Sequence, residues 1–266
     1  MEHYIYLCED CLEGIFSAVY KAYEDRHNHK ENEIRIHTPV FNRELFCQYI
    51  MVETDFERAL KVARTIQREI SGEAYDFLIK SAGSCRLEKA DAIYRFIIEG
   101  LRVGNRVLGY LTAPFMQTLF SINRNIENEI HHFKEFLRFQ ELENGALFGK
   151  INPKNVVLPF MADHFMDRFY EEDWIIADTV HRTVLIHRRK QGCNYLSMEE
   201  TDFDKLELKY SEEEQDMQRL WKLFVDTIAI RERVNPKLQR QLLPLRFRKY
   251  MNEFSGREVI YNEVVN

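Results

Sequence analysis

Glycine and proline are scarce in this sequence, with 10 and 6 copies respectively among 266 residues. So few chain-breaking residues argue against disorder, a collagen-like repeat or a loop-dominated fold. Hydrophobic residues make up 45% of the chain, which is enough at this length to bury a core in one large domain or two small ones. The composition therefore predicts a folded globular protein.

The chain also lacks the features of membrane and secreted proteins. No apolar run approaches the roughly 20 residues that cross a bilayer. Residues 1–7 have neither the positive start nor the small-residue cleavage site of a signal peptide. The five cysteines are an odd number and are scattered, so a disulfide framework is not expected. We expect a cytoplasmic protein with no membrane partner.

Several catalytic and cofactor signatures are missing too. The sequence has no GxxxxGK[ST] phosphate loop, no GxGxxG, no HExxH and no GxSxG. A single CxxC spans Cys8 and Cys11, but a structural zinc site needs four ligands and no second pair exists. A structural or incidental role for these thiols is favoured over a redox one, and we predict no cofactor and no metal site.

Charge is unevenly distributed along a chain whose net charge is -6. Residues 199–216 contain nine acids and two lysines, whereas residues 231–249 contain seven bases and Glu232 as the only acid. The basic segment, with Phe247 and Tyr250 interleaved, would suit phosphate contacts combined with base stacking. An intramolecular clasp between the acidic and basic segments is the competing interpretation.

Hydrophobic periodicity predicts an α+β fold that is helix-rich, with a long buried central helix and a small, mainly antiparallel sheet. One integrated domain is favoured, with a soft division into residues 1–105 and 106–266. Predicted strands cover residues 4–8, 34–37, 146–152, 174–178, 183–187 and 193–196. Predicted helices cover residues 12–24, 54–70, 75–79, 93–101, 114–143, 160–169 and 211–230. In the last helix we expect an inward face made of Met217, Leu220, Trp221, Phe224, Val225 and Ile228.

The central helix, whose most informative part is residues 125–143, has two apolar sides. Leu119, Ile122, Ile126, Ile130, Phe133 and Leu137 fall within a band about 80° wide, which is typical of a core face. His132, Phe136 and Phe139 gather on nearly the opposite side. A helix with two apolar sides is expected to lie inside the protein, and His132 is interpreted as a hydrogen-bonded core histidine.

The third side of this helix is polar and carries His131, Glu135 and Arg138. His131 and Glu135 are four residues apart, so a carboxylate could orient the imidazole or the two could ligate a metal. A solvated edge with ordinary ion pairs is the more common meaning of this spacing.

Two shorter constellations contain basic residues. His164 and Arg168 share one face of a short predicted helix, where imidazole and guanidinium could bind a phosphate. A helix clamped to the core by Phe165 and Phe169 is an equally favoured interpretation. The string His187-Arg-Arg-Lys190 ends a predicted strand and could contact a phosphate backbone, although soluble sheet ends commonly look the same.

A resemblance covers nearly the whole chain in order. It rests on Cys8-Glu-Asp with Glu13-Gly-Ile-Phe16, Ala90-Asp-Ala-Ile-Tyr-Arg-Phe96, His131-His-Phe-Lys-Glu-Phe-Leu-Arg-Phe139, Asn152-Pro-Lys-Asn155, His164-Phe-Met-Asp-Arg-Phe169, Trp174-Ile-Ile176 and Asn235-Pro-Lys237. In these segments the sequence resembles an uncharacterised family of proposed DNA metabolism or DNA repair proteins. The family often continues with histidine where this chain has Asn155, which weakens any metal or proton-transfer role there.

The resemblance implies a role with DNA. Members of that family are often encoded beside a radical-SAM iron–sulfur protein, and a related domain is found fused to uracil-DNA glycosylase-like proteins. This chain lacks the three-cysteine motif of a radical-SAM cluster, so the resemblance implies the companion and not the radical enzyme.

Three hypotheses follow. The leading one is a nucleic-acid-binding accessory protein in DNA repair or modification, whose functional surface is formed by His131, Arg138, His164, Arg168, Lys237, Arg240, Arg246 and Arg248. The second is a stand-alone hydrolase or lyase on damaged nucleotides, with His131 and Glu135 as an acid/base pair. The third is a structural adaptor.

Overall fold

The computed structural model describes residues 3–29, 33–39, 44–198 and 209–254. The chain divides into two compact units, Met1–Glu127 and Asn128–Asn266. The boundary falls inside α5 (Pro114–Phe136), the long helix that the sequence predicted. Integration of the two units into one domain stays a prediction.

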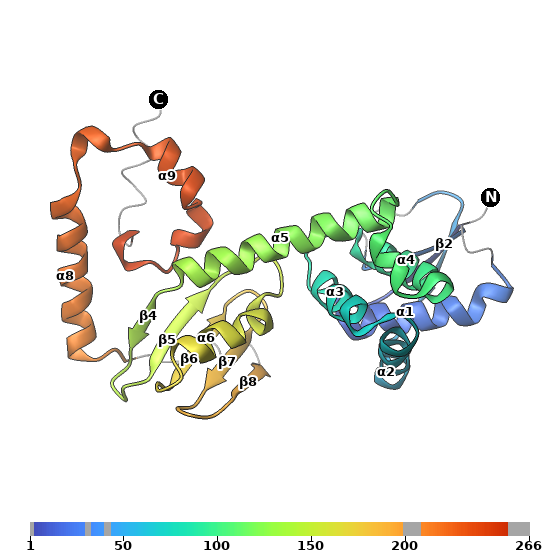
Figure 1. Ribbon diagram of the computed structural model, residues 1–266, viewed down its shortest axis with the longest axis horizontal. Coiled ribbons are helices and arrows are strands. Elements are labelled where there is room, and N and C mark those ends of the chain that lie inside the picture. The colour runs from blue at the N-terminus through green and yellow to red at the C-terminus, as the bar shows by residue number, and fades with distance from the viewer. Residues whose placement is uncertain (1–2, 30–32, 40–43, 199–208, 255–266) are drawn as a thin grey trace. The chain divides into compact units, whose positions relative to one another are not determined.

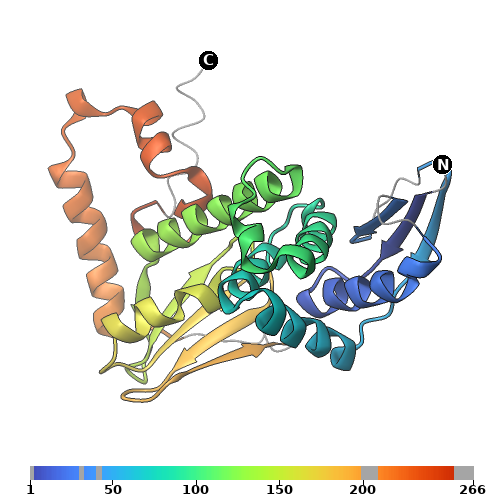
Figure 2. The same ribbon diagram turned by 45° about the vertical axis from the view of Figure 1, so that its right-hand side comes forward.

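The first unit contains a three-stranded, fully parallel sheet of order β2-β1-β3. Its strands are β1 (His3–Leu7), β2 (Ile34–His37) and β3 (Cys47–Met51). Figure 2 shows α1 (Leu12–Glu24) lying along this sheet, as the crossover between β1 and β2. The first two strands are confirmed, but β3 was not predicted; its apolar run at residues 49–52 is short, and none of the strand's residues is fully buried.

Helices pack around this sheet and form the core of the unit. They are α1, α2 (Phe56–Thr65), the π-helix η3 (Ile66–Ile70), α3 (Gly72–Ala82), α4 (Lys89–Val103) and the first part of α5, with 3₁₀ turns η1 (Asp25–His27) and η4 (Gly104–Gly109). The side chains of Asp55 and Ser71 cap the first turns of α2 and α3 by accepting backbone N–H bonds. Gly104 ends α4 at φ +65°. The core includes the fully buried Tyr6, Phe16 and Phe96.

Helix α5 ends at Phe136, so the prediction that it continues to Glu143 was wrong. Residues Phe139–Glu141 form β4, which pairs antiparallel with β5. Gly145, at φ +80°, lies in the turn between these strands and does not cap a helix. Residues 137–143 have good helix propensity, but strand pairing and packing of the Phe139 ring outweigh it.

The second unit is built on a five-stranded sheet of order β4-β5-β6-β7-β8. Its remaining strands are β5 (Leu147–Ile151), β6 (Trp174–Asp178), β7 (Thr183–His187) and β8 (Cys193–Ser197). Only β5 and β6 pair in parallel, so this sheet is mainly antiparallel, and the α+β class is confirmed. The turn η5 (Leu158–Met161) and α6 (Ala162–Arg168) form the crossover between β5 and β6.

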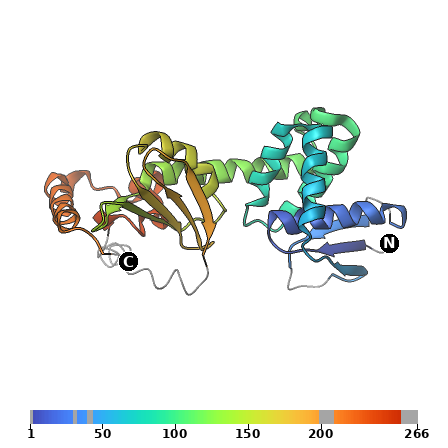
Figure 3. The same ribbon diagram turned by 90° about the horizontal axis from the view of Figure 1, so that it is seen from below.

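Aromatic rings attach α6 to the sheet. Phe165 packs edge-on against Phe139 and Trp174, with ring centroids 5.6 and 6.2 Å away, and Phe169 lies 5.1 Å from Phe139. Figure 3 shows α6 and the C-terminal part of α5 on the same face of the sheet. A smaller apolar cluster that includes Phe148 and Val184 forms a second core patch of this unit.

The described chain after the sheet is mainly helical, apart from an isolated antiparallel bridge between Tyr210 and Leu142 and short connections. It contains α8 (Glu212–Ile228), η6 (Arg231–Arg233), α9 (Pro236–Leu242), η7 (Leu245–Arg248) and η8 (Asn252–Phe254), labelled in part in Figure 1. The inward face predicted for α8 was wrong: Met217, Leu220, Trp221, Phe224 and Ile228 are 44–62% exposed, and Val225 is only half-buried. A different side of α8 faces the unit. None of the helices in the described ranges combines the length and apolarity that a membrane crossing needs.

Candidate nucleic-acid interface

Three of the arginines that the sequence assigned to phosphate binding are held by internal partners. Arg246 Nη1 lies 2.8 Å from Glu129 Oε1, and Arg138 Nη2 lies 3.0 Å from Glu253 Oε1. Arg248 donates from Nε and Nη2 to the Leu243 carbonyl oxygen, at 3.1 and 2.9 Å. The Arg246–Glu129 pair joins the C-terminal segment to α5, Arg138 joins the residues after α5 to Glu253, and Arg248 bonds within the C-terminal segment, so all three guanidinium groups have a structural role.

The Glu129 carboxylate is the centre of one such network, and sequence reasoning missed it. Its side chain is 1% exposed and accepts hydrogen bonds from the backbone N–H groups of Lys154 (2.8 Å) and Asn155 (3.2 Å), besides the Asn155 amide and Arg246. A buried carboxylate needs such partners, because unpaired charge in a protein interior is costly. The signal in the sequence was an acid adjacent to the core position Ile130 on a long helix. The Asn-Pro-Lys-Asn segment therefore has a structural role here.

A second group of basic side chains is not used in this way. Lys134 on α5 and His164 and Arg168 on α6 form what we call the α5–α6 cationic cluster. In the described part of the chain, neither Lys134 nor Arg168 forms an ion pair with a carboxylate. Arg168 is exposed and lies 5.4 Å from the centre of the Phe169 ring. The predicted pair on one face of a helix is thus present, with Lys134 as an unpredicted third member.

His164 has an unusual environment within this cluster. Burial lowers the pKa of its imidazole below the ordinary value, and the charges of Lys134 and Arg168 lower it further, while Asp167 acts in the opposite direction. Its Nε2 atom is buried, and no described residue gives it a hydrogen bond. The lowered pKa favours the neutral imidazole at neutral pH, and the nearby charges of Lys134 and Arg168 would attract an anion.

The histidine pair of α5 divides as predicted from the helical wheel. His131 Nε2 lies 3.1 Å from Glu135 Oε1, with side chains that are 68% and 46% exposed, so this is a solvent-facing pair worth little to stability. The His132 ring packs against Phe247 and Phe136, with centroids 4.9 and 5.8 Å away. His132 Nδ1 lies 3.8 Å from Glu135 Oε2, which is too far for a hydrogen bond, so the expected hydrogen bond is missing at that buried atom although Glu135 is near both histidines.

The basic tail segment is only partly available to a ligand. Lys237 and Arg240 are exposed on α9, which Asn235 caps by accepting a hydrogen bond from the Leu238 N–H at 3.0 Å. Phe247 is 5% exposed and packs on α5, so its expected role in base stacking was wrong. Most of the acidic segment proposed to clasp this tail, residues 199–208, lies outside the described residues.

A buried Asp–His pair on the β6–β7 turn was also missed. Asp178 is 0% exposed and accepts from the backbone N–H groups of Val180 and His181, at 2.9 and 3.1 Å. Its other oxygen lies 2.7 Å from Nδ1 of the partly exposed His181, and this contact fixes the orientation of the imidazole ring. Across the described ranges, no three His, Cys, Asp or Glu side chains are grouped to hold a metal ion.

The CxxC motif has a structural role in this fold. Cys11 caps α1 by accepting a hydrogen bond from the Gly14 N–H at 3.3 Å. Cys8 is buried, and burial raises the pKa of its thiol to about 12. A thiol that stays protonated is a poor nucleophile, so this pair is not poised for redox chemistry.

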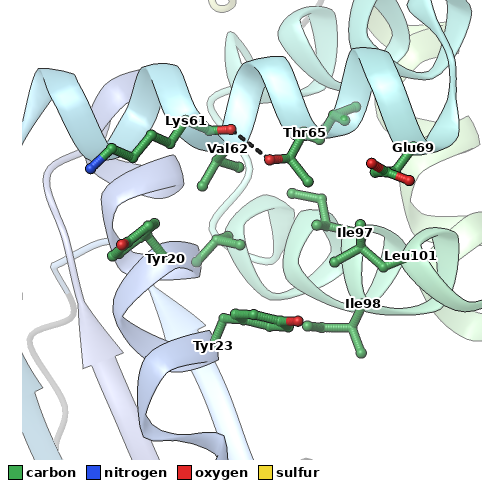
Figure 4. Close-up of a pocket in the computed structure, with 11 residues that line it drawn as sticks. Tyr20, Tyr23, Lys61, Val62, Thr65, Glu69, Ile97, Ile98 and Leu101 are labelled. Carbon is green, nitrogen blue, oxygen red and sulfur yellow. Dashed lines mark hydrogen bonds between the residues drawn. The ribbon is translucent and has the colours of Figure 1, made fainter.

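The first unit contains a pocket of about 330 Å³ between α1, α2 and α4 (Figure 4). Its walls are mainly apolar, with Val19, Val62, Ile66, Ile97 and Leu101 among them. Figure 4 shows Tyr20 and Tyr23 on one side, and Lys61 and Thr65 on another, joined by the Thr65 hydroxyl donating to the Lys61 carbonyl at 2.8 Å. None of the site residues predicted from the sequence lines this pocket.

Comparison with known proteins gives a family but no activity. No curated protein matches the chain. A solved structure described as the DHH domain of a member of the s1p family of ribosomal proteins aligns with a TM-score of 0.27 and 10% identity, over 70% of this chain and 73% of that chain. The family model described as a domain of unknown function, DUF4130, matches residues 87–253, a range that includes every site residue predicted above. Because this match spans more than half of the sequence, the chain belongs to the DUF4130 family.

Proposed function

We propose that this protein binds nucleic acid through phosphate contacts made by the α5–α6 cationic cluster, as an accessory protein in DNA repair or modification. The observation that carries the proposal is the availability of Lys134 and Arg168 beside His164. Other candidate cations, Arg138 and Arg246, already have carboxylate partners. A cation that pairs with a buried carboxylate contributes to the fold. A cation that has no carboxylate partner among the described residues can instead pair with a ligand.

The three groups differ in ways that suit a phosphodiester. The Arg168 guanidinium can offer two parallel N–H donors to phosphate oxygens, and the Lys134 ammonium acts as a compact point charge. The neutral His164 imidazole can donate one hydrogen bond without adding a third charge that would repel the other two. Phosphate contacts of this kind supply affinity and are independent of base sequence.

Further phosphates of a longer ligand would meet other exposed cations of the same unit. Lys237 and Arg240 on α9 have no carboxylate partner within the described ranges. Arg189 and Lys190 at the β7–β8 turn both contact Glu171, at 3.4 and 3.2 Å, which reduces their net field. We therefore rank the cluster first, α9 second and the hairpin turn third as contact regions.

The test is a salt titration of binding to fluorescently labelled single-stranded and duplex oligonucleotides, measured by anisotropy. The double variant Lys134→Ala with Arg168→Ala should weaken binding and reduce the slope of log K against log salt by about 1.4 to 1.8, at roughly 0.7 to 0.9 per lost contact. Arg219→Ala is a matched control, because this exposed arginine of α8 pairs with Asp216. Failure of the wild-type protein to bind any oligonucleotide at low salt would refute the proposal.

The accessory role rests on the family resemblance and needs its own experiment. We propose that the partner is a radical-SAM iron–sulfur protein, and that DNA joins the complex. Co-purification of the two proteins, with and without added DNA, should recover the partner in at least one condition. If DNA binding is confirmed but the partner is never recovered, the accessory role is wrong while phosphate binding stands.

A further inference from the structure

Helix α8 carries an apolar stripe that no described part of the chain covers. The stripe consists of Met217, Leu220, Trp221, Phe224 and Ile228, with exposed fractions of 62, 58, 44, 51 and 58%. At 100° per residue these positions fall within about 100° of one another on the helix surface. The Trp221 and Phe224 rings stack 5.7 Å apart. A contiguous apolar surface of this kind commonly marks an interface.

The side of α8 that meets its own unit is a neighbouring one. Glu214, Gln218, Lys222 and Val225 are the half-buried residues there, and the helix packs against η8. Ser211 caps the first turn by accepting a hydrogen bond from the Glu214 N–H at 3.0 Å. The helix is therefore held in place by contacts that leave the stripe open.

Four of the five stripe residues are placed symmetrically about the midpoint of the stripe. Met217 and Ile228 are equally far in sequence from the point between Lys222 and Leu223, and so are Trp221 and Phe224. Two antiparallel copies related by a two-fold axis at that point would place Met217 on Ile228 and Trp221 on Phe224 of the other copy. A two-fold contact of this kind requires a self-complementary patch, and these two pairs of residues provide one; the counterpart of Leu220 is the half-buried Val225.

The charges at the two ends of α8 favour the same arrangement. Its first turn contains Glu212, Glu213 and Glu214, and Arg231-Glu232-Arg233, with one net positive charge, follows its C-terminal end in sequence. Antiparallel pairing brings each acidic end near the basic end of the other copy, whereas parallel pairing would place like charges together. The helix dipoles are also opposed in the antiparallel pair.

We propose that α8 is a homodimerisation helix that pairs antiparallel with α8 of a second copy of this chain. Its 17 residues span about 25 Å, at roughly 1.5 Å per residue, which allows three to four turns of contact. Further exposed apolar side chains follow the helix in the sequence, namely Ile230, Val234, Leu238, Leu242 and Leu245.

Sedimentation velocity of the full-length protein over a wide concentration range tests the dimer. The wild-type protein should sediment as a dimer, and Phe224→Asp should raise the dimer Kd at least about tenfold, because it places a charge at the centre of the interface. Leu223→Asp is the matched control, because Leu223 is 64% exposed on the same helix but lies off the stripe. Circular dichroism should show that both variants are folded. A wild-type protein that is monomeric at all concentrations would overturn the proposal. The stripe would then have another occupant, either a different protein or residues 255–266.

Charge reversal tests the antiparallel orientation. Glu213→Arg and Arg233→Glu should each weaken the dimer, and the combination of the two should restore it, because each acidic end then meets a partner of opposite sign again. A dimer that both single variants weaken and the combination weakens further would contradict antiparallel pairing.

Discussion

Glu129 gives the sharpest stability prediction in the second unit. Its carboxylate is 1% exposed and accepts hydrogen bonds from Arg246, from the Asn155 amide, and from the backbone N–H groups of Lys154 and Asn155. Glu129→Ala removes the acceptor for all of these donors at once. The donors from the Lys154–Asn155 segment cannot move away easily, because backbone groups are fixed by the fold.

The expected loss in the free energy of unfolding depends on which groups each substitution leaves unpaired. Breaking a buried charge pair by removing one partner costs about 3 to 5 kcal/mol, which is a large share of the roughly 5 to 15 kcal/mol that stabilises a domain. Arg246 is 34% exposed, so after Arg246→Ala the loss is smaller, about 1 to 2 kcal/mol, because the remaining backbone donors still satisfy the carboxylate. The account therefore predicts an asymmetry: loss of the acid costs more than loss of the base.

Urea unfolding followed by tryptophan fluorescence measures both variants, because Trp174 is fully buried in this unit. Glu129→Gln should fall between them, since an amide keeps the shape and one acceptor. Equal losses for Glu129→Ala and Arg246→Ala, or a loss below about 1 kcal/mol for the former, would show that this carboxylate does not organise the segment.

Three further predictions concern other positions. Gly104→Ala should destabilise by about 1 to 3 kcal/mol, because φ +65° with ψ -149° is unfavourable for any side chain, whereas Gly72→Ala should be neutral in the same urea assay. Under native conditions at pH 8, the exposed Cys85 should react with Ellman's reagent. Cys8, whose pKa is raised to about 12, should react only after unfolding. Rapid modification of Cys8 in the native protein would contradict its burial. Inorganic phosphate should raise the lowered pKa of His164 in an NMR titration. Because the folded pKa is the lower one, this histidine should reduce stability as pH falls from its ordinary pKa to the lowered one, and His164→Ala should remove that dependence.

Periodicity predicted most of the fold, and its failures have a common cause. Strand β6 and the start of α5 were predicted at their observed positions, because burial on a regular element leaves a repeating pattern. The end of α5 was missed, since pairing of β4 with β5 is a tertiary contact that outweighs local helix propensity. The stripe of α8 was detected, but periodicity shows only that a face is apolar and does not show what covers it.

The candidate site was harder to predict, because its composition depends on which cations find carboxylates. Arg138 meets Glu253 across 115 positions of sequence, and no local pattern announces that pair. Lys134 was missed because a single lysine in a helix carries no local signal. It becomes a site candidate only because α6 places His164 and Arg168 near it. The sequence therefore predicted a set of candidate basic residues, and the fold shows which of them pair with carboxylates among the described residues.

The salt dependence of DNA binding tests the central claim most directly. The account predicts that wild-type protein binds duplex DNA with an affinity that falls as salt rises, and that Lys134→Ala combined with Arg168→Ala lowers the slope by about 1.8 while Arg219→Ala leaves it unchanged. An unchanged slope in the double variant would show that the α5–α6 cationic cluster does not contact phosphate.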